Sequence, residues 1–398
     1  MRSGQSGVTP HPDPPSHGGG SFCAAHRWWS IVARSLAQTR LRVGIVGCGL
    51  IAQVMHLHYL RELHDRFEVA ALCDLSRTVV DRVGEAYGVD RRFTDWTQLL
   101  EEPLDAVMVL TSGSHEPIAV AAAQAGRHVF IEKPIALSEA EGQRIIAAGK
   151  KAGVRLMVGY MKRYDPAVER MAEELRDVKA LRFATSTTAE YPLKWYVAQY
   201  PIIRGTDIDA KALGTLESDD EARVTAAIGI VDPMLRHAYR HSLLDSMIHD
   251  LNLMRGLLGE SERLRFASVT QAAVSLFLEF PQTAAAMHWV NLMDGVAQYR
   301  QEFSFFSPQQ RASLNFPSPF LRNMPTELVL EGGSTDTSRA WRTAERVSYE
   351  SAFKRELVEF YDSVTTDRAP RTTAEDAVRD VALCQAIIRQ HLALVGLA

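Results

Sequence analysis

Short apolar runs alternate with longer amphipathic stretches between residues 41 and 160. The apolar runs are rich in Val, Ile and Leu, which is typical of buried strands, and the amphipathic stretches have the apolar spacing of helices. Strands are predicted over residues 41–46, 67–73, 104–110, 128–131 and 156–158. Helices are predicted over residues 50–63, 78–87 and 116–125, and from Ser138, which forms a capping box with Glu141. This alternation indicates βαβ units and a parallel sheet.

After residue 160 the alternation stops, and strand-like runs follow one another with few helices between them. These runs cover residues 180–187, 264–269, 274–280, 284–290, 298–306 and 327–330. Helices are predicted over residues 243–258 and 353–364, and over 374–389 behind Thr372 or Thr373. The pattern predicts a mainly antiparallel open sheet with helices on one face. The expected fold class is α/β, with a parallel-sheet domain followed by an α+β domain.

Composition divides the chain further. Residues 1–40 are rich in Pro, Gly and His and are expected to form a disordered leader, because such a segment buries too little apolar surface to fold. Residues 41–162 would form the parallel-sheet domain. Residues 163–398 would form a domain for substrate binding and oligomerisation. Within it, residues 190–241 lack a regular pattern and are expected to form an inserted loop.

Charge and cysteine content narrow the classes of partner. The 398 residues carry a formal net charge of −4 and no basic stripe interleaved with aromatics, so we expect no nucleic-acid partner. No apolar run reaches the roughly eighteen residues of a membrane span, and residues 1–40 lack the features of a secretory signal. The four cysteines form no CxxC pair and no zinc framework. A cytoplasmic protein that binds a small molecule is expected.

The run Gly47-Cys48-Gly49-Leu50-Ile51-Ala52 follows the first predicted strand and opens a helix. The first glycine permits a tight turn, the second lets backbone N–H groups approach a pyrophosphate, and Ala52 lets helix and strand pack closely. Asp74 ends the second strand, where a carboxylate can bond ribose hydroxyls. The pattern predicts a Rossmann-type NAD(P)-binding domain over residues 41–162. NAD is favoured over NADP because an acid repels a 2′-phosphate, although Arg77 nearby can pair with such a phosphate.

The run Phe130-Ile131-Glu132-Lys133-Pro134, together with the Gly47 turn, resembles the glucose-fructose oxidoreductase / inositol dehydrogenase / MocA (Gfo/Idh/MocA) family. Further matching stretches are Thr111 to His115, Gly126 to Val129, Val158 to Tyr164 with Pro166, and Phe353 to Phe360. The resemblance extends from about Leu41 to the C-terminus and is closest over residues 41–165. It is specific to the family and not to a substrate.

The resemblance implies a Rossmann domain, a mainly antiparallel α/β domain, and a substrate held over the nicotinamide between them. Lys133 would contact the substrate and the nicotinamide ribose, and Pro134 would be a cis-proline. His115 would lie on the nicotinamide side, with a helix-capping role as the alternative. The implied cofactor contacts are Gly47, Gly49, Leu50, Ile51, Ala52, Asp74, Thr111, Ser112, His115, Glu132, Lys133 and Arg163. No metal site is expected, because no His, Asp or Glu cluster has ligand spacing and hydride transfer needs no metal.

Asp245 and His249 are four residues apart, so on a helix their side chains share a face. In the family, an Asp and a His at this spacing flank the reacting hydroxyl of the substrate. The resemblance therefore makes His249 the general acid/base, a role that suits imidazole because its pKa is near neutral pH. Asp245 would bind substrate hydroxyls or hold the imidazole, and Lys133 would stabilise the developing alkoxide. The alternative is an ordinary ion pair on a helix surface.

The interval between Lys133 and Asp245 is 112 residues (245 − 133), which is longer than the family usually shows. The excess falls in residues 190–241, whose aromatic residues can stack on sugar faces and whose acidic residues can attract a cationic aminosugar. This segment would be a lid or an oligomer arm that shapes the substrate pocket. The alternative is a solvated acidic loop.

Three functions fit these residues. The favoured one is an NAD(P)-dependent dehydrogenase that oxidises a secondary hydroxyl of a sugar, cyclitol or aminosugar and assembles as a dimer or tetramer through its C-terminal sheet. The second is a glycoside-cleaving enzyme that uses NAD for a transient oxidation and releases no NADH. The third is a non-catalytic nucleotide-binding regulator, which would not need Lys133, Asp245 and His249 together.

Overall fold

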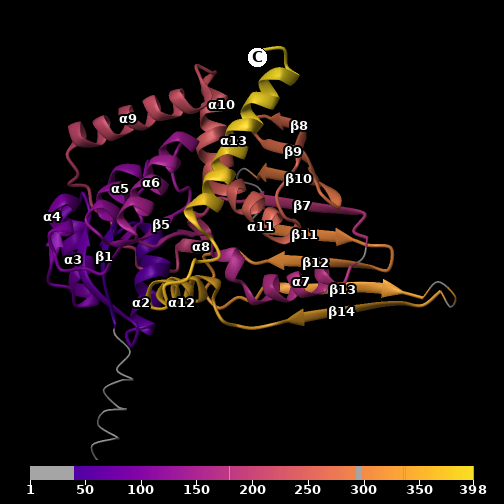
Figure 1. Ribbon diagram of the computed structural model, residues 1–398, viewed down its shortest axis with the longest axis horizontal. Helices are drawn as coiled ribbons and strands as arrows, with labels where there is room; N and C mark the ends of the chain where they lie inside the picture. Colours follow the sequence, from indigo (N-terminus) through magenta and orange to yellow (C-terminus); the bar gives the residue numbers. More distant parts are fainter. Residues whose placement is uncertain (1–39, 179, 293–297, 335, 337, 398) are drawn as a thin grey trace, which may run out of the picture. The chain divides into compact units, whose positions relative to one another are not determined.

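The computed structural model describes residues 40–178, 180–292, 298–334, 336 and 338–397. The leader expected over residues 1–40 lies outside this part of the chain, apart from Arg40. The described residues form a parallel sheet and a second, larger sheet, each with helices packed against it (Figure 1). Within them, we find no helix that combines the length and the apolar composition needed to cross a bilayer.

The first sheet contains six parallel strands in the order β3-β2-β1-β4-β5-β6. They are β1 (Leu41–Val46), β2 (Phe67–Cys73), β3 (Arg92–Phe93), β4 (Ala106–Val109), β5 (His128–Glu132) and β6 (Leu156–Gly159). The predicted parallel sheet is therefore confirmed. Because β1 lies between β2 and β4, the strand order reverses at β1, and open parallel sheets bind ligands at the carboxyl ends of strands at such a point.

Helices connect these strands. They are η1 (Ala52–His56) with α2 (Leu57–Glu62), α3 (Arg77–Tyr87), α4 (Trp96–Leu100), α5 (Glu116–Gln124) and α6 (Glu139–Ala152). The side chain of Ser138 accepts the N–H of Glu141 and caps α6, as predicted. The second half of the predicted capping box is absent from the described hydrogen bonds, because the Glu141 carboxylate instead accepts the N–H of Leu137 at 3.1 Å and pairs with Arg223.

The second sheet contains eight strands in the order β14-β13-β12-β11-β7-β10-β9-β8. They are β7 (Phe183–Glu190), β8 (Arg263–Val269), β9 (Ala273–Phe280), β10 (Thr283–Asn291), β11 (Arg300–Phe306), β12 (Gln310–Phe316), β13 (Glu327–Gly333) and β14 (Ala340–Arg346). Only β7 and β10 pair in parallel, so the mainly antiparallel sheet is confirmed. The sequence pattern misses β12, which is rich in polar residues, and β14, which is almost wholly exposed.

Several further helices pack beside the two sheets. They are η2 (Met161–Tyr164), α7 (Pro166–Arg176), α11 (Ile248–Leu258), α12 (Ala352–Thr365) and α13 (Ala374–Leu394). α13 packs against both α6 and β8, so it bridges the two sheets. Thr373 caps α13 by accepting the N–H of Asp376, which confirms the predicted start of this helix.

Residues 190–241 are not the irregular loop that their sequence predicts. They contain α8 (Lys194–Val197), α9 (Ala210–Ile228), α10 (Pro233–His237) and the first residues of η3 (Ala238–Met247). The sequence pattern misses α9 because most of its side chains are exposed and leave no apolar stripe; its N-terminus is capped by Asp209. η3 has the wide turns of a π-helix and continues into α11, so the helix predicted over 243–258 begins earlier than expected.

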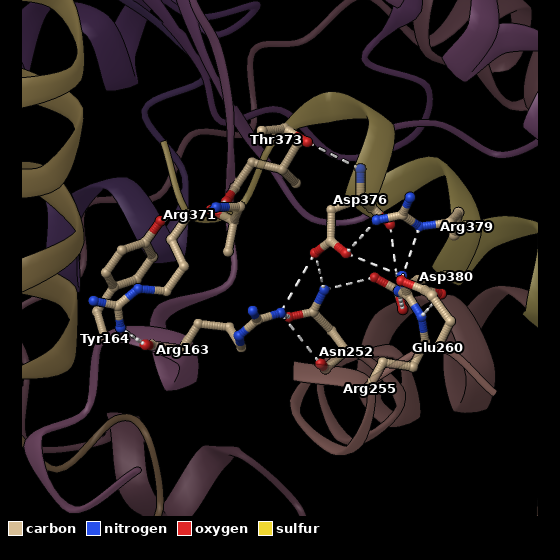
Figure 2. Close-up of polar contacts among 12 residues, drawn as sticks. Arg163, Tyr164, Asn252, Arg255, Glu260, Arg371, Thr373, Asp376, Arg379 and Asp380 are labelled. Atoms are coloured by element: carbon tan, nitrogen blue, oxygen red, sulfur yellow. Dashed lines mark hydrogen bonds and ion pairs between the residues drawn. The ribbon is translucent and has the colours of Figure 1, made fainter. Parts of the chain in front are cut away.

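A buried ionic network ties α11 to α13 (Figure 2). Arg255 on α11 donates to Asp376 at 3.0 Å and also to Asp380, both on α13. Asn252 donates to the same two carboxylates at 3.0 and 2.7 Å. Burial raises the pKa of Asp380 to about 7, although the charge of Arg255 opposes that rise. Because buried charges persist only when they are paired, the network fixes how the two helices meet.

Arg255→Ala should lower the free energy of unfolding by about 3–5 kcal/mol, because it leaves the fully buried carboxyl group of Asp380 without its cation. Arg379→Ala is the matched control. Arg379 also pairs with Asp376, but its side chain is 53% exposed, so its loss should cost less than about 1 kcal/mol. Urea denaturation of the two variants measures the difference. Equal losses of unfolding free energy in the two variants would show that burial of the ion pairs does not determine their contribution to stability.

Candidate active site

The turn after β1 is open on the side where a ligand would approach. Gly47 has φ of +96°, and a Cβ there would lie 2.7 Å from a backbone carbon in the loop after β4. No described atom lies within 4 Å of the place where a Cβ of Gly49 would be. Asp74 accepts the N–H groups of Cys48 at 2.8 Å and of Ser76 at 2.9 Å, and so holds the turn to the end of β2. An open glycine turn at the start of a helix fits the pyrophosphate of a dinucleotide.

A cleft of about 810 Å³ extends from this turn to the second sheet. Residues of η3, α11, β10 and β11 border it on the far side. The predicted site residues that line it are Gly49, Leu50, Ile51, Thr111, Ser112, His115, Glu132, Lys133, Asp245 and His249. Its volume lies within the range that is usual for small-molecule and cofactor sites in proteins.

His115 connects two loops of the cleft. The residue is the N-cap of α5, but its side chain makes no capping hydrogen bond. The buried imidazole instead lies between the carbonyl oxygens of Thr111 and Pro134, with 2.8 Å from a ring nitrogen to each. The peptide bond between Lys133 and Pro134 is cis, as predicted. His115 thus fixes the loop that carries Lys133 relative to the loop after β4.

Lys133 and Asp245 meet at the cleft from the two sides of the molecule. The Lys133 Nζ donates to Asp245 Oδ1 at 2.7 Å and to the backbone oxygen of Asp245 at 2.5 Å. Burial raises the pKa of the Asp245 carboxyl, but the charge and hydrogen bond of Lys133 outweigh burial and hold that pKa below its usual value. Asp245 therefore pairs across the cleft, and the alternative of an ordinary ion pair with His249 on one helix does not apply.

His249 lines the same cleft, on the first turn of α11. Its Nδ1 is buried and has no hydrogen-bond partner among the described residues. Its ring meets the ring of Tyr160 edge-on, with 6.0 Å between ring centroids. Burial, followed by the positive charges of Lys133 and Lys162, lowers the pKa of His249 well below its usual value. The imidazole is therefore neutral and can accept a proton at neutral pH.

A second polar group lies deeper in the cleft and was not predicted from the sequence. The ammonium of Lys162 is buried 3.7 Å from Asp250, which accepts hydrogen bonds from Thr188 and Gln301, each at 2.5 Å. Burial lowers the pKa of Lys162 and raises that of Asp250. Glu190 lines the cleft beside them, and burial raises its pKa as well. The signal in the sequence is Asp250 itself, a charged residue close to the apolar Ile248, Leu251 and Leu253 of α11.

Four predicted cofactor residues do not line the cleft: Gly47 and Asp74 lie at the glycine turn, and Ala52 and Arg163 lie elsewhere. Ala52 is fully buried, where the first helix packs on the sheet, as its small size predicts. Arg163 points to another part of the molecule. Its guanidinium lies 3.3 Å from Asn252 Oδ1 and 3.5 Å from Asp376 Oδ2, so it joins the network of Figure 2 and does not line the cleft. The neighbouring Lys162 lines the cleft in its place.

A buried cluster lies behind the cleft. His56 Nε2 is 2.6 Å from Glu132 Oε1, while both carboxyl oxygens of Glu356 lack a hydrogen-bond partner among the described residues. The ligand atoms of these three residues lie within 4.8 Å of one another, a spacing that a metal ion also fits. Sequence spacing does not reveal the cluster, because its members are far apart in the chain.

Burial, followed by the charge of Glu132, raises the pKa of Glu356 well above its usual value. A raised pKa favours the neutral, protonated form of Glu356. Glu132 in turn accepts the N–H of Lys133 at 3.1 Å. We interpret the cluster as a proton-sharing support for the loop of Lys133.

Glu356→Gln should become more stable than the wild type as pH rises. A raised pKa in the folded state means that the folded protein binds more protons, so wild-type stability falls above the ordinary pKa of Glu, by up to about 1.4 kcal/mol per pH unit. Gln does not titrate. Melting temperatures between pH 5 and pH 9 should therefore diverge in favour of the variant. Parallel curves, or a loss of stability on adding EDTA, would mean that a cation neutralises the cluster instead.

Comparison with known proteins places the first domain. Residues 41–160 match a family model described as "Oxidoreductase family, NAD-binding Rossmann fold". D-apiose dehydrogenase of Paraburkholderia graminis is 36% identical over 149 residues, which cover 37% of this chain and 39% of that protein. Myo-inositol 2-dehydrogenase of Thermotoga maritima is 32% identical over 139 residues, 34% of this chain and 41% of that protein. The chain therefore matches about two fifths of the length of these curated relatives.

The likeness in fold extends further than the likeness in sequence. The crystal structure of aldose-aldose oxidoreductase from Caulobacter crescentus, complexed with glycerol, superposes with a TM-score of 0.68 at 21% identity. The superposition covers 89% of this chain and 98% of that chain. Both sheets therefore belong to one shared architecture.

Proposed function

We propose that this protein, whose residues 41–160 match the model of the Gfo/Idh/MocA oxidoreductase family, is an NAD(P)-dependent dehydrogenase that oxidises a secondary hydroxyl of a sugar or cyclitol. The proposal is supported above all by one observation. Lys133, Asp245 and a neutral His249 face one cleft that begins at an open dinucleotide turn. This arrangement combines a cofactor site, a proton acceptor and a positive charge, which are the requirements of alcohol oxidation.

A bound nicotinamide cofactor supplies the hydride acceptor. His249 accepts the hydroxyl proton, and we assign this role to Nε2 because Nδ1 is buried and has no partner among the described residues. Lys133 places its ammonium where negative charge develops on the substrate oxygen, and Asp245 holds that ammonium in place. The side chains of Glu132 and His115 keep the Lys133 loop in position, because they bond the backbone N–H of Lys133 and the backbone oxygen of Pro134.

The charge of the cleft favours a neutral substrate. Its lining contains three acidic residues, Glu132, Glu190 and Asp245, and three basic residues, Lys133, Lys162 and Arg240. Apart from Glu190, none of the acidic residues expected to attract an aminosugar lines the cleft, and two of them, Asp220 and Glu221, pair with Arg240 at 3.4 and 2.6 Å. An uncharged polyol is therefore the substrate class that we propose, in place of an aminosugar.

NAD is the cofactor that we propose. The carboxylate of Asp74 ends β2, next to the place of the adenosine ribose, and a 2′-phosphate there would meet its charge. Arg77, which could otherwise pair with a 2′-phosphate, pairs with Asp81 at 3.5 Å.

We further propose a cytoplasmic dimer or tetramer formed through the open face of the second sheet, where Phe183 and Phe277 lie with 6.0 Å between ring centroids.

Lys133→Ala and His249→Ala should each lower kcat by about 10²–10⁴-fold, the usual effect of losing a charge-stabilising group or a general base. The substrate is first identified by mixing purified protein with NAD and a panel of sugars and cyclitols and measuring the absorbance of the NADH formed. Lys150→Ala, which removes an exposed lysine paired with Glu375, is the control and should leave kcat unchanged. A near-normal kcat in His249→Ala would place the base elsewhere. Turnover without NADH release would favour the glycoside-cleaving alternative, and NAD binding without turnover would favour the regulator.

The pH profile of kcat/KM should reflect the lowered pKa of His249. The base must start neutral, so oxidation falls only below the folded-state pKa, and the acid limb should lie below the ordinary histidine value of about 6.5. Lys133→Met removes one of the charges that lower this pKa, so the acid limb of the residual activity should move to higher pH. An acid limb that does not move would contradict the coupling of the two groups.

A further inference from the structure

The segment after α8 follows the carboxyl edge of the parallel sheet. Residues 202–223 contact the loops after β2, β1 and β4, which are neighbours in that order in the sheet. The second half of this segment belongs to α9, which Figure 1 shows beside α5 and α6. A dinucleotide bound to a Rossmann sheet lies along the same edge, with its pyrophosphate at the turn after the first strand.

The first contact lies at the adenosine end. Asp207 accepts the hydroxyl of Ser76 and, at 2.9 Å, the N–H of Thr78. Ser76 is the N-cap of α3 and follows Asp74 closely in the chain. Gly205 passes so near that a Cβ there would lie 2.0 Å from the Ser76 hydroxyl. The carboxylate of Asp207 thus occupies the N-terminus of the helix after β2.

The second contact lies beside the glycine turn. The side-chain amide of Gln53, on η1, donates to the backbone oxygen of Ile203 at 2.9 Å and accepts its N–H at 2.8 Å. The same amide donates to the backbone oxygen of Cys48, within the turn, at 2.7 Å. One side chain therefore joins the segment to the pyrophosphate loop.

The third contact lies beyond β4, on the nicotinamide side. Asp220 accepts the N–H of Ser114 at 3.2 Å, and a Cβ at Gly113 would lie 2.3 Å from the Asp220 carboxylate. Arg223 then pairs with Glu141 at 2.7 Å and with Glu116 at 3.4 Å. The segment is thereby anchored on both sides of the glycine turn.

We propose that residues 202–223 form a clasp across the bound dinucleotide, with Asp207 as a residue that selects NAD over NADP. This inference rests on the proposed NAD(P) site. The 2′-phosphate of NADP would compete with the Asp207 carboxylate for the N-terminus of α3 and meet its negative charge, whereas NAD leaves that contact intact. A clasp fixed at both ends must open before the nucleotide leaves, so reduced nucleotide dissociates slowly. The bonds from Ser76 and Thr78 lower the pKa of Asp207 to about 2, so the carboxylate stays ionised at neutral pH.

The experiment measures the binding of NADH and NADPH by stopped-flow nicotinamide fluorescence, with no substrate present. Asp207→Ala should raise the NADH dissociation rate by about 10-fold and shift the NADPH-to-NADH affinity ratio by a similar factor toward NADPH, the usual size of one charge-assisted hydrogen bond. Asp207→Asn removes the charge and keeps one acceptor oxygen, so it should shift the affinity ratio more than the dissociation rate. Asp219→Ala is the matched control, because it also removes one carboxylate from the segment. Asp219 lies on α9, is exposed and makes no polar contact among the described residues.

Two failures are distinguishable. Wild-type protein that binds neither NADH nor NADPH would overturn the proposed function together with the clasp. Wild-type protein that binds NADH, with Asp207→Ala and Asp219→Ala giving the same rates and the same affinity ratio as wild type, would overturn the clasp alone. Circular dichroism and melting temperature of each variant establish that it is folded, and Asp207→Asn supplies the conservative substitution if Asp207→Ala does not fold.

Discussion

The contact between Lys133 and Asp245 is the constraint on which the candidate site depends. Lys133 follows β5 of the parallel sheet, whereas Asp245 lies on η3, beside the second sheet. Neither sheet alone contains the charge, the proton acceptor and the glycine turn. The candidate site is therefore formed by the way in which the two sheets are held together, and small shifts between them would separate Lys133 from Asp245.

Several supports maintain that contact. His115 and the cluster around Glu132 fix the Lys133 loop from the side of the first sheet. The Arg255 network fixes α11, which carries His249, against α13, and α13 itself packs on both sheets. The wide turns of η3 place Asp245 and His249 on the cleft together, and such turns are frequent at functional sites. Buried charges are thus used to hold rigid elements in place, while the cleft keeps a balanced charge.

Sequence reasoning succeeded where a pattern is local. The parallel sheet, the Gly47 turn and the cap at Ser138 each depend on residues close together in the chain. The sequence does not predict an element or an orientation that depends on solvent exposure or on tertiary packing. α9 lacks an apolar stripe, so its sequence predicts a loop, and β14 is exposed along almost its whole length. Within η2, orientation alone decides that Lys162 faces the cleft while its neighbour Arg163 faces Asn252.

The same distinction applies to the inserted segment. Its acidic residues suggested an attraction for a cationic substrate, because sequence shows charge without showing the partner. In the fold, Asp207 and Asp220 contact the loops of the nucleotide edge. These contacts favour a role of the segment at the proposed cofactor site over a role in attracting a cationic substrate.

The proposed hydride transfer is tested most directly by following the hydrogen from the carbinol carbon of the substrate to the nucleotide. The protein is mixed with NAD and a polyol that carries deuterium on the carbinol carbon, and the reduced nucleotide is analysed by mass spectrometry. Direct transfer within the cleft predicts one deuterium in each NADH formed, with none lost to solvent. Reduced nucleotide that contains hydrogen from water, or no reduced nucleotide across a panel of sugars and cyclitols, would contradict the assignment of this cleft to hydride transfer.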